Sequence, residues 1–344
     1  MGRTEVAALS AAFLAATAPA SADIQDAAKY NAGKGGVSMV VVKDGNRIFE
    51  NYPGKGGPEK AWELASGTKS FSGVIAAAAV QDRLLSLDER AADTLAEWKA
   101  DPQKAQITIR QILSLTSGVE GGDLFRPPSY ADAIAKPMAD APGAVFNYGP
   151  VNFQIFGEIM RRKLRHYEGG KYADAIEYLQ ARILTPLDIH PAQWNERDGY
   201  PTLPSGADIT AREWARFGQF VLQGGNWKSA QLVDPAALAE TLRGSKANAA
   251  YGLTWWLNEQ PSAATLKASR TMTVASDLFT HPRRAELPED LFMAAGAGGQ
   301  RLYVIPSMSL VIVRQYPRVV ERKLGQKRRG GPYSDVEFLL EFLK

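Results

Sequence analysis

Residues 63–81 read Glu-Leu-Ala-Ser-Gly-Thr-Lys-Ser-Phe-Ser-Gly-Val-Ile-Ala-Ala-Ala-Ala-Val-Gln, and the rest of the chain is interpreted around this stretch. After Ser66 it contains no proline, carries little charge and is rich in Ala, Val and Ile. A helix that is apolar on every side lies in the interior of a protein. The stretch therefore predicts a buried helix that starts at Ser66 and continues to Gln81.

Strand patterns lie on both sides of this helix, toward the two ends of the chain. Residues 37–43 and 46–52 flank Asp44-Gly45, a pair typical of a tight β-hairpin turn. Near the other end, strands are expected at residues 253–257, 301–305 and 310–315, followed by an apolar helix at 334–343.

The middle of the chain is expected to be helical. Helical patterns interrupted by Pro and Gly occur at residues 107–116, 153–165 and 211–223. Strands at both ends with helices between them predict an α/β (α+β) fold, in which an antiparallel sheet from both chain ends is flanked by helices. The expected sheet lobe comprises about 30–84 and 246–344, and the inserted helical lobe about 85–245. A small-molecule cleft is expected between the lobes.

Residues 1–22 differ from the rest of the chain. Arg3 precedes an apolar stretch at residues 6–18, and Ala20-Ser21-Ala22 supplies the small residues of a cleavage site. These features predict a signal peptide over residues 1–22, with a frayed N-terminal helix as the alternative. The mature domain, residues 23–344, is then expected to be secreted or periplasmic and to contain no membrane span.

Composition limits the classes of partner. Forty basic and 37 acidic residues leave a formal charge of +3, which is too small to indicate a nucleic-acid partner. The basic run from Arg318 to Arg329 is interpreted as a solvated loop. The absence of cysteine excludes disulfides and thiol catalysis. A small-molecule partner is therefore expected, and the sequence leaves the oligomeric state open.

Ser66 and Lys69 form the single Ser-x-x-Lys motif of the chain. Residues three apart share a helix face, so Lys69 can place its amine beside the Ser66 hydroxyl. Serine becomes a good nucleophile when a nearby base takes its proton, and burial lowers the pKa of a lysine toward that role. The three histidines are His166, His190 and His281. They lack the spacing of a Ser-His-Asp triad or of a metal site, so neither a metal nor a cofactor is expected.

With this motif the chain resembles the serine β-lactamase and penicillin-binding-protein superfamily, especially its class C and esterase branches. Residues 66–69 match the first motif of the family. Phe146-Asn147-Tyr148-Gly149-Pro150 falls where the family has its Tyr-x-Asn element. Residues 294–300, Ala-Ala-Gly-Ala-Gly-Gly-Gln, correspond to the third element, which is normally Lys-Thr-Gly or His-x-Gly. The resemblance extends from Gly36 to the C-terminus and implies a β-lactamase-like fold.

The resemblance also implies a serine-hydrolase mechanism. Ser66 would attack an ester or amide carbonyl and form an acyl-enzyme, while Lys69 and Tyr148 share the proton transfer. The oxyanion of the intermediate would be bound by the backbone N–H groups of Ser66 and Ala297.

Further candidate binding residues lie close to these positions. Gly296 and Gly298 have no side chains that would block an approaching carbonyl. Asn152 is a candidate substitute for the missing Asn of the second motif, with an ordinary structural role as the alternative. Trp255 is a candidate substrate-binding residue, because it alternates with Trp256 along a strand and one of the two is expected to face the cleft.

Two departures from the family pattern concern the substrate. Pro150 stands where the second motif usually has Asn, and no Lys or His precedes Gly296. In β-lactam-processing relatives these residues position the amide and carboxylate of the substrate. The departures therefore favour a carboxylic ester or linear amide, as in nylon-oligomer hydrolases and related esterases.

Three alternatives to this reading stay open: a β-lactamase, a D-peptidase and a non-catalytic binder of cell-wall peptides. An arginine from elsewhere could restore recognition of an anionic substrate, and the candidates are Arg126, Arg270 and Arg301.

Overall fold

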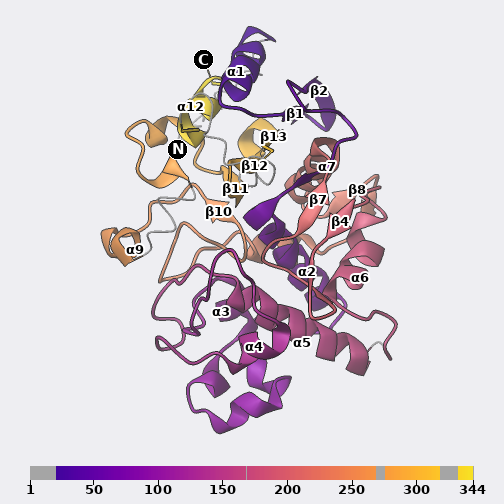
Figure 1. Ribbon diagram of the computed structural model, residues 1–344, viewed down its shortest axis with the longest axis vertical. Coiled ribbons are helices and arrows are strands. Elements are labelled where there is room, and N and C mark those ends of the chain that lie inside the picture. The colour runs from indigo at the N-terminus through magenta and orange to yellow at the C-terminus, as the bar shows by residue number, and fades with distance from the viewer. Residues whose placement is uncertain (1–20, 168, 269–275, 318–331, 344) are drawn as a thin grey trace, which may run out of the picture.

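The computed structural model describes residues 21–167, 169–268, 276–317 and 332–343. Its main sheet has six antiparallel strands in the order β10-β11-β12-β13-β1-β2 (Figure 1). These strands are β1 (Ser38–Lys43), β2 (Asn46–Asn51), β10 (Trp256–Leu257), β11 (Phe292–Gly296), β12 (Gln300–Ile305) and β13 (Leu310–Gln315). The predicted antiparallel sheet, built from both ends of the chain and flanked by helices, is confirmed.

Turn chemistry and strand register explain how the two ends of the chain join. Asp44 (φ 50°) and Gly45 (φ 78°) adopt the left-handed conformation that a two-residue hairpin turn requires. The other edge of β1 pairs with β13, so that Val41 lies opposite Ile312. The sheet thus places segments from opposite ends of the sequence side by side.

One face of the sheet is covered by α7 (Ala211–Leu222), which packs against β1, β12 and β13. The contact is close, because a Cβ atom on Gly218 would lie 2.5 Å from Leu302 Cδ1. This helix falls within residues 85–245, which were expected to form a separate helical lobe, yet it packs on the sheet. Its buried aromatic residues, among them Phe217 and Phe220, explain this position.

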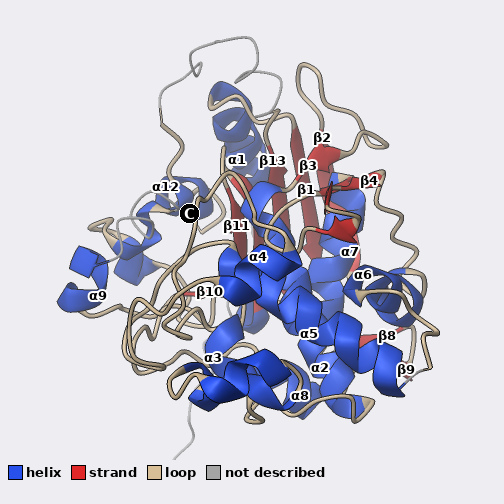
Figure 2. Ribbon diagram, turned by 60° about the horizontal axis from the view of Figure 1, so that its bottom comes forward, coloured by secondary structure: helices blue, strands red, loops and turns tan. Residues whose placement is uncertain are grey.

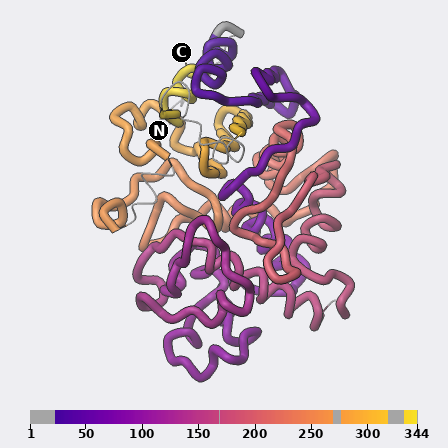
Figure 3. The backbone as a smooth tube through the Cα atoms, viewed as in Figure 1, coloured from indigo at the N-terminus to yellow at the C-terminus, as the bar shows by residue number. Residues whose placement is uncertain are grey.

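The opposite face is covered by α1 (Ser21–Gly33) and α12 (Asp335–Leu340). Successive residues of a strand point to opposite faces, so Tyr303 points away from α7. Its ring centroid lies 5.8 Å from that of Phe338 in α12. Tyr30 of α1 packs 6.2 Å from the same Phe338, and the first and last described helices lie side by side (Figure 3).

The predicted buried helix is α2 (Ser70–Gln81), in which ten residues are buried. Helices from the middle of the sequence surround it on the side away from the sheet strands (Figure 2). The other helices of the described residues are α3 (Ile109–Leu113), α4 (Tyr130–Ala135), α5 (Val151–Tyr167), α6 (Ala175–Leu179), α8 (Pro235–Glu240) and α9 (Ala263–Ala268).

A second, small sheet connects the start of α2 to the middle of the chain. β3 (Trp62–Glu63) pairs with β7 (Ala207–Ile209), and β7 pairs with β4 (Gln193–Trp194). Two further two-stranded ribbons are formed by β5 (Glu196–Arg197) with β6 (Tyr200–Pro201) and by β8 (Asn226–Trp227) with β9 (Ala230–Gln231).

Two predictions concern residues whose structure is not described. Residues 1–20, most of the predicted signal peptide, and the basic run 318–329 lie outside the described residues. Within the described residues, the helices are too short or too polar to cross a membrane.

Candidate active site

Ser66 lies in a 3-10 turn, Ala65–Lys69, that leads directly into α2. The sequence predicted Ser66 as the start of the α-helix, and the α-helix in fact begins four residues later, at Ser70. Ala65 has a φ of 48°, a left-handed conformation that costs a non-glycine residue roughly 1–2 kcal/mol. The chain therefore bends sharply just before Ser66, which remains partly exposed while Gly67, Thr68 and Lys69 are buried.

Lys69 reaches back to Ser66 from the end of this turn. Its Nζ lies 3.0 Å from Ser66 Oγ and donates a hydrogen bond of 2.8 Å to the carbonyl oxygen of Pro204. The side chain is buried, and burial lowers the pKa of Lys69 to about 7 because it penalises the charged ammonium. In the described part of the chain no carboxylate forms an ion pair with this amine.

Aromatic rings surround the amine of Lys69. Nζ lies 5.0 Å from the ring centroid of Tyr148 and 5.3 Å from that of Phe153. Such faces stabilise a cation by roughly 0.5–2 kcal/mol. A lowering of the pKa from 10.5 to about 7 corresponds to several kcal/mol, so the burial penalty is the larger effect. Near pH 7 a substantial share of Lys69 is therefore the neutral amine.

Tyr148 lies beside both groups, just before α5. Burial raises its pKa to about 12, although a hydrogen bond with Ser66 and the charge of Arg301 act in the opposite direction. The ring stacks on Trp256, with centroids 5.4 Å apart and planes at 26°. Tyr148 is therefore a neutral phenol at physiological pH, held in place by aromatic packing.

The turn between β11 and β12 packs against the Ser66 turn. A Cβ atom on Gly296 would lie 2.0 Å from the carbonyl oxygen of Leu64 and 3.1 Å from the nitrogen of Gly67, so only glycine fits. Ala297 and Gly298 follow, and both are partly exposed. The two chain segments that were predicted to supply the oxyanion donors are thus adjacent.

Trp255 and Trp256 point in different directions, as strand alternation predicts. Trp256 contacts Tyr148, whereas Trp255 is fully buried, with its ring 6.1 Å from Phe217 and 5.2 Å from Phe292. The selection of Trp255 as a substrate-binding residue is therefore not supported by its position. Trp256 is the one beside the reactive groups.

Asn152 is buried in the first turn of α5. Its Oδ1 accepts a hydrogen bond of 2.6 Å from Ser117 Oγ, which ties α5 to the segment after α3. This contact is the structural role that was considered as the alternative to substrate binding. Pro150 precedes the helix, and its carbonyl accepts hydrogen bonds from the N–H groups of Phe153 and Gln154.

The three arginines considered for anionic substrates have different positions. Arg126 is exposed, and Arg270 lies outside the described residues. Arg301 is buried and forms a bidentate ion pair with Asp335, with Nε to Oδ1 at 2.5 Å and Nη2 to Oδ2 at 3.0 Å. Its charge is therefore balanced inside the protein. Ala294 and Ala295, which stand in the third motif, are buried and carry no charge.

Sequence reasoning missed two groups of this site. The Pro204 carbonyl that binds Lys69 is a backbone atom, and nothing in the side chains indicates it. Asp335, the partner of Arg301, lies 34 residues further along the chain. An arginine that opens an apolar strand does indicate that a buried counter-ion exists, but it does not indicate which carboxylate.

Comparisons with known proteins cover most of the chain. The sequence profile of the family described as Beta-lactamase matches residues 21–324. Protein flp from Staphylococcus aureus (strain COL) is 27% identical over 147 residues, which cover 37% of this chain and only 29% of that protein.

Two solved structures are similar over nearly the whole fold. A protein assigned as a 6-aminohexanoate-dimer hydrolase from Bacillus anthracis has a TM-score of 0.65 at 16% identity, and the match covers 92% of this chain and 79% of that one. EstCE1, described as a hydrolase with promiscuous acyltransferase activity, has a TM-score of 0.64 at 15% identity, covering 93% and 96%. At these identities the two structures support the fold alone.

Proposed function

The chain belongs to the beta-lactamase family, and on that basis we propose that it is a serine hydrolase that forms an acyl-enzyme on Ser66. The observation that carries this proposal is the distance of 3.0 Å between Lys69 Nζ and Ser66 Oγ, combined with a pKa of Lys69 lowered to about 7. A neutral amine within hydrogen-bond reach of a serine hydroxyl can accept its proton during attack.

In the first step Ser66 Oγ attacks the substrate carbonyl carbon while its proton passes to Lys69 Nζ. The carbonyl oxygen becomes an oxyanion, which accepts hydrogen bonds from the N–H groups of Ser66 and Ala297. When the intermediate collapses, the bond to the alcohol or amine breaks. The leaving group takes up the proton from Lys69 through the hydroxyl of Tyr148, which is neutral near pH 7 because burial raises its pKa to about 12.

The acyl-enzyme is then hydrolysed by the same groups in reverse order. A water molecule loses a proton to the Lys69 and Tyr148 pair as it attacks the acyl carbonyl, and the proton finally returns to Ser66 Oγ. The net reaction consumes one water molecule and releases a carboxylic acid together with an alcohol or amine.

For the substrate we propose a carboxylic ester or a linear amide without a recognised carboxylate. Three features support this choice: Pro150 has no side-chain amide, Ala294 and Ala295 have no charge, and Arg301 is already paired with Asp335. A substrate carboxylate would lose its hydration here without gaining a charged partner. The two similar structures, one assigned as a 6-aminohexanoate-dimer hydrolase and one described as a hydrolase with promiscuous acyltransferase activity, agree with this class.

The test of the nucleophile is Ser66→Ala, assayed with p-nitrophenyl butyrate. We expect kcat/KM to fall at least about 1,000-fold with an unchanged melting temperature, because the acyl-enzyme cannot form. Ser72→Ala is the matched control, since the Ser72 hydroxyl is buried in α2 without a partner among the described residues and should be dispensable. Activity within a few fold of wild type in Ser66→Ala would refute the serine mechanism, whereas a wild-type protein without turnover would indicate a non-catalytic binder.

The test of the substrate class compares kcat/KM for p-nitrophenyl butyrate with that for nitrocefin, a β-lactam that carries a carboxylate. A missing charge-assisted hydrogen bond is worth about 1.5–3 kcal/mol, so we expect the ester to be preferred by roughly 10- to 100-fold or more. A clear preference for nitrocefin would mean that the β-lactamase alternative is correct.

A further inference from the structure

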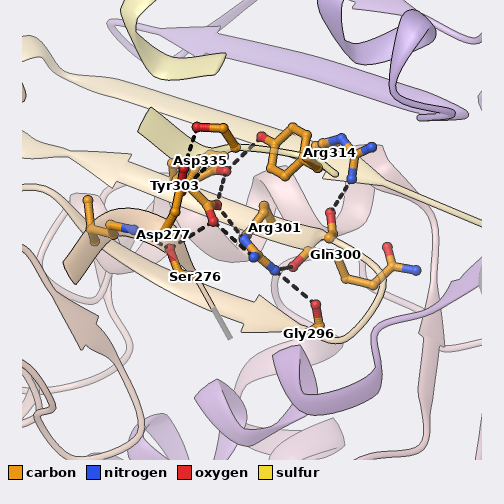
Figure 4. A network of polar contacts seen from close by, with 12 residues as sticks. Ser276, Asp277, Gly296, Gln300, Arg301, Tyr303, Arg314 and Asp335 are labelled. Atoms are coloured by element: carbon orange, nitrogen blue, oxygen red, sulfur yellow. Dashed lines mark hydrogen bonds and ion pairs between the residues drawn. The ribbon is translucent and has the colours of Figure 1, made fainter. Parts of the chain in front are cut away.

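A buried ion pair between Arg301 and Asp335 lies next to Gly296, the residue that precedes Ala297 (Figure 4). Arg301 is the second residue of β12 and Asp335 the first of α12, and both side chains are buried. We infer that Arg301, held by Asp335, is a positioning residue that aims the Ala297 N–H at the substrate oxyanion. This inference rests on the acyl-enzyme reaction proposed for Ser66.

The Nη1 end of the Arg301 guanidinium binds the backbone of the same turn. Nη1 donates hydrogen bonds of 2.9 Å to the carbonyl oxygen of Gly296 and 3.0 Å to that of Gln300. The Gly296 oxygen also accepts a hydrogen bond of 3.2 Å from the N–H of Gly299. These two donors to the Gly296 oxygen come from β12 and the turn that leads into it.

The direction of this carbonyl determines the direction of the next N–H. The Gly296 carbonyl and the Ala297 N–H belong to one peptide unit, which is planar and trans, so the two bonds point in opposite directions. Because Arg301 fixes the carbonyl toward β12, the Ala297 N–H points away from β12. Within the described residues β10 pairs with β11 only at Met293 and Phe292, so no described strand pairs with that side of β11 at Ala297.

The packing of Gly296 shows which chain segment borders this peptide. Its Cα faces the carbonyl of Leu64, just before the Ser66 turn, and the nitrogen of Gly67, the residue that follows Ser66. The Ala297 N–H thus lies in the region where a carbonyl attacked by Ser66 would develop negative charge. A cation on the carbonyl of a peptide also polarises the N–H of the same unit and makes it a stronger donor.

Asp335 and its neighbours explain why Arg301 holds one position. Asp335 accepts hydrogen bonds from Tyr303 and from Ser276 Oγ at 2.7 Å, while Asp277 binds its backbone N–H at 2.8 Å. Two hydrogen bonds thereby fix the carboxylate itself, and the third fixes the backbone that carries it. Two parallel bonds to it leave the guanidinium with a single orientation, which a flexible lysine would not share.

The experiment compares two arginines that lie opposite each other in neighbouring strands. Arg314 of β13 is the register partner of Arg301, is fully buried, and donates to the carbonyl of Gly299 at 2.6 Å, not to that of Gly296. Arg301→Lys and Arg314→Lys each remove hydrogen bonds from a buried guanidinium to the backbone, and only the first removes the donor to the Gly296 carbonyl and the bidentate pair with Asp335.

With p-nitrophenyl butyrate we expect kcat of Arg301→Lys to fall about 10- to 100-fold while KM stays within about threefold, as for the weakening of one oxyanion donor. The affinity for phenylboronic acid, which forms a tetrahedral adduct with the serine, should fall in parallel with kcat. Arg314→Lys should keep kcat and boronate affinity within about threefold of wild type, even if its melting temperature drops as much as that of Arg301→Lys. If Arg301 had a purely structural role, Arg301→Lys would lower the melting temperature without lowering kcat and boronate affinity more than Arg314→Lys does.

Equal losses of kcat in both variants, or an unchanged kcat in a folded Arg301→Lys, would overturn the inference. If Arg301→Lys does not fold, Asp335→Asn provides the same comparison, because it keeps the shape of the carboxylate and loosens Arg301; here too kcat and boronate affinity should fall together. Failure of the proposed function is distinguishable, since it would appear as full activity in Ser66→Ala, whatever the arginine variants do.

Discussion

Lys69 and Arg301 are both buried basic side chains near the Ser66 turn, but their surroundings shift their pKa values in opposite directions. Among the described residues Lys69 Nζ hydrogen-bonds to Ser66 Oγ and the carbonyl of Pro204 and pairs with no carboxylate, and burial lowers its pKa to about 7. Arg301 faces the Asp335 carboxylate, and this charge raises its pKa against the effect of burial. Burial alone therefore does not decide what a cation does. The presence or absence of a counter-ion decides it.

The residue type at each position fits its surroundings, with a lysine where no counter-ion is present among the described residues and an arginine where one is. A lysine amine can lose its proton when its charged form is penalised, whereas a guanidinium stays charged in any protein environment. The proposed base is thus the group that can be neutralised, and the proposed anchor is the group that cannot. Removal of Lys69 should therefore lower mainly the activity, and removal of the partner of Arg301 should lower mainly the stability.

The largest expected effect comes from removing the unpaired base and its partner. Lys69→Met and Tyr148→Phe should each lower kcat/KM for p-nitrophenyl butyrate by about 100- to 10,000-fold, as expected for general acid–base groups. The double variant should be little worse than either single one, because groups that act as one proton-transfer unit are not additive. Additive losses would show that the two side chains act in separate steps.

The next effect concerns stability and should have opposite signs at the two cations. Asp335→Ala leaves Arg301 buried without a partner and should lower the free energy of unfolding by about 3–5 kcal/mol. Lys69→Met should instead raise it at pH 7 by roughly 2 kcal/mol, since it removes the cost of burying or deprotonating the Lys69 ammonium, which exceeds the cost of leaving the Pro204 carbonyl without this donor. Urea denaturation of both variants measures the two free energies of unfolding. A Lys69→Met variant less stable than wild type would contradict the prediction.

The pH dependence of unfolding in Lys69→Met tests the direction of the Lys69 pKa shift. The folded pKa of Lys69, about 7, lies below its ordinary value of 10.5, so between these values the unfolded chain binds more protons. The Lys69 contribution to wild-type stability therefore rises with pH from about 7 to 10.5. The advantage of Lys69→Met should shrink over that range.

The smallest expected effect is the pH dependence of the reaction. Because the proposed mechanism uses the neutral amine, it predicts that kcat/KM falls about tenfold per pH unit below the pKa of Lys69, near 7, and levels off above it. Lys69→Arg should show no such rise at any accessible pH, since its guanidinium does not lose a proton. A rising limb centred above pH 9 would indicate that the Tyr148 phenolate, not the lysine, is the base.

The sequence predicted the parts of the site that depend on local spacing. Ser66 and Lys69 are three residues apart, and their contact exists even though a 3-10 turn replaces the expected α-helix, because both helix types bring such residues together. For Trp255 and Trp256 alternation was readable, but not which one faces Tyr148. That depends on the pairing of Trp256 with Met293, a contact set by the whole sheet.

The remaining features depend on long-range contacts. The limits of α7 were predicted almost to the residue, yet an apolar helix face does not specify which surface it covers, and this one covers the sheet. The pairing of Arg301 with Asp335 depends on where α12 packs. The left-handed Ala65 has no sequence signal either, because alanine usually avoids this conformation.

The pairing of β1 with β13 has a consequence for how the protein is made. The partner of β1 is encoded about 270 residues later, so at roughly 5–20 residues per second it emerges some 15–50 s after β1. During that interval the apolar run from Met39 to Val42 presents an unpaired strand edge, on which chains associate. Variants that are stable once folded can therefore still be lost on the ribosome or soon after it, and the yield of soluble protein, not the melting temperature, is the quantity that reveals this.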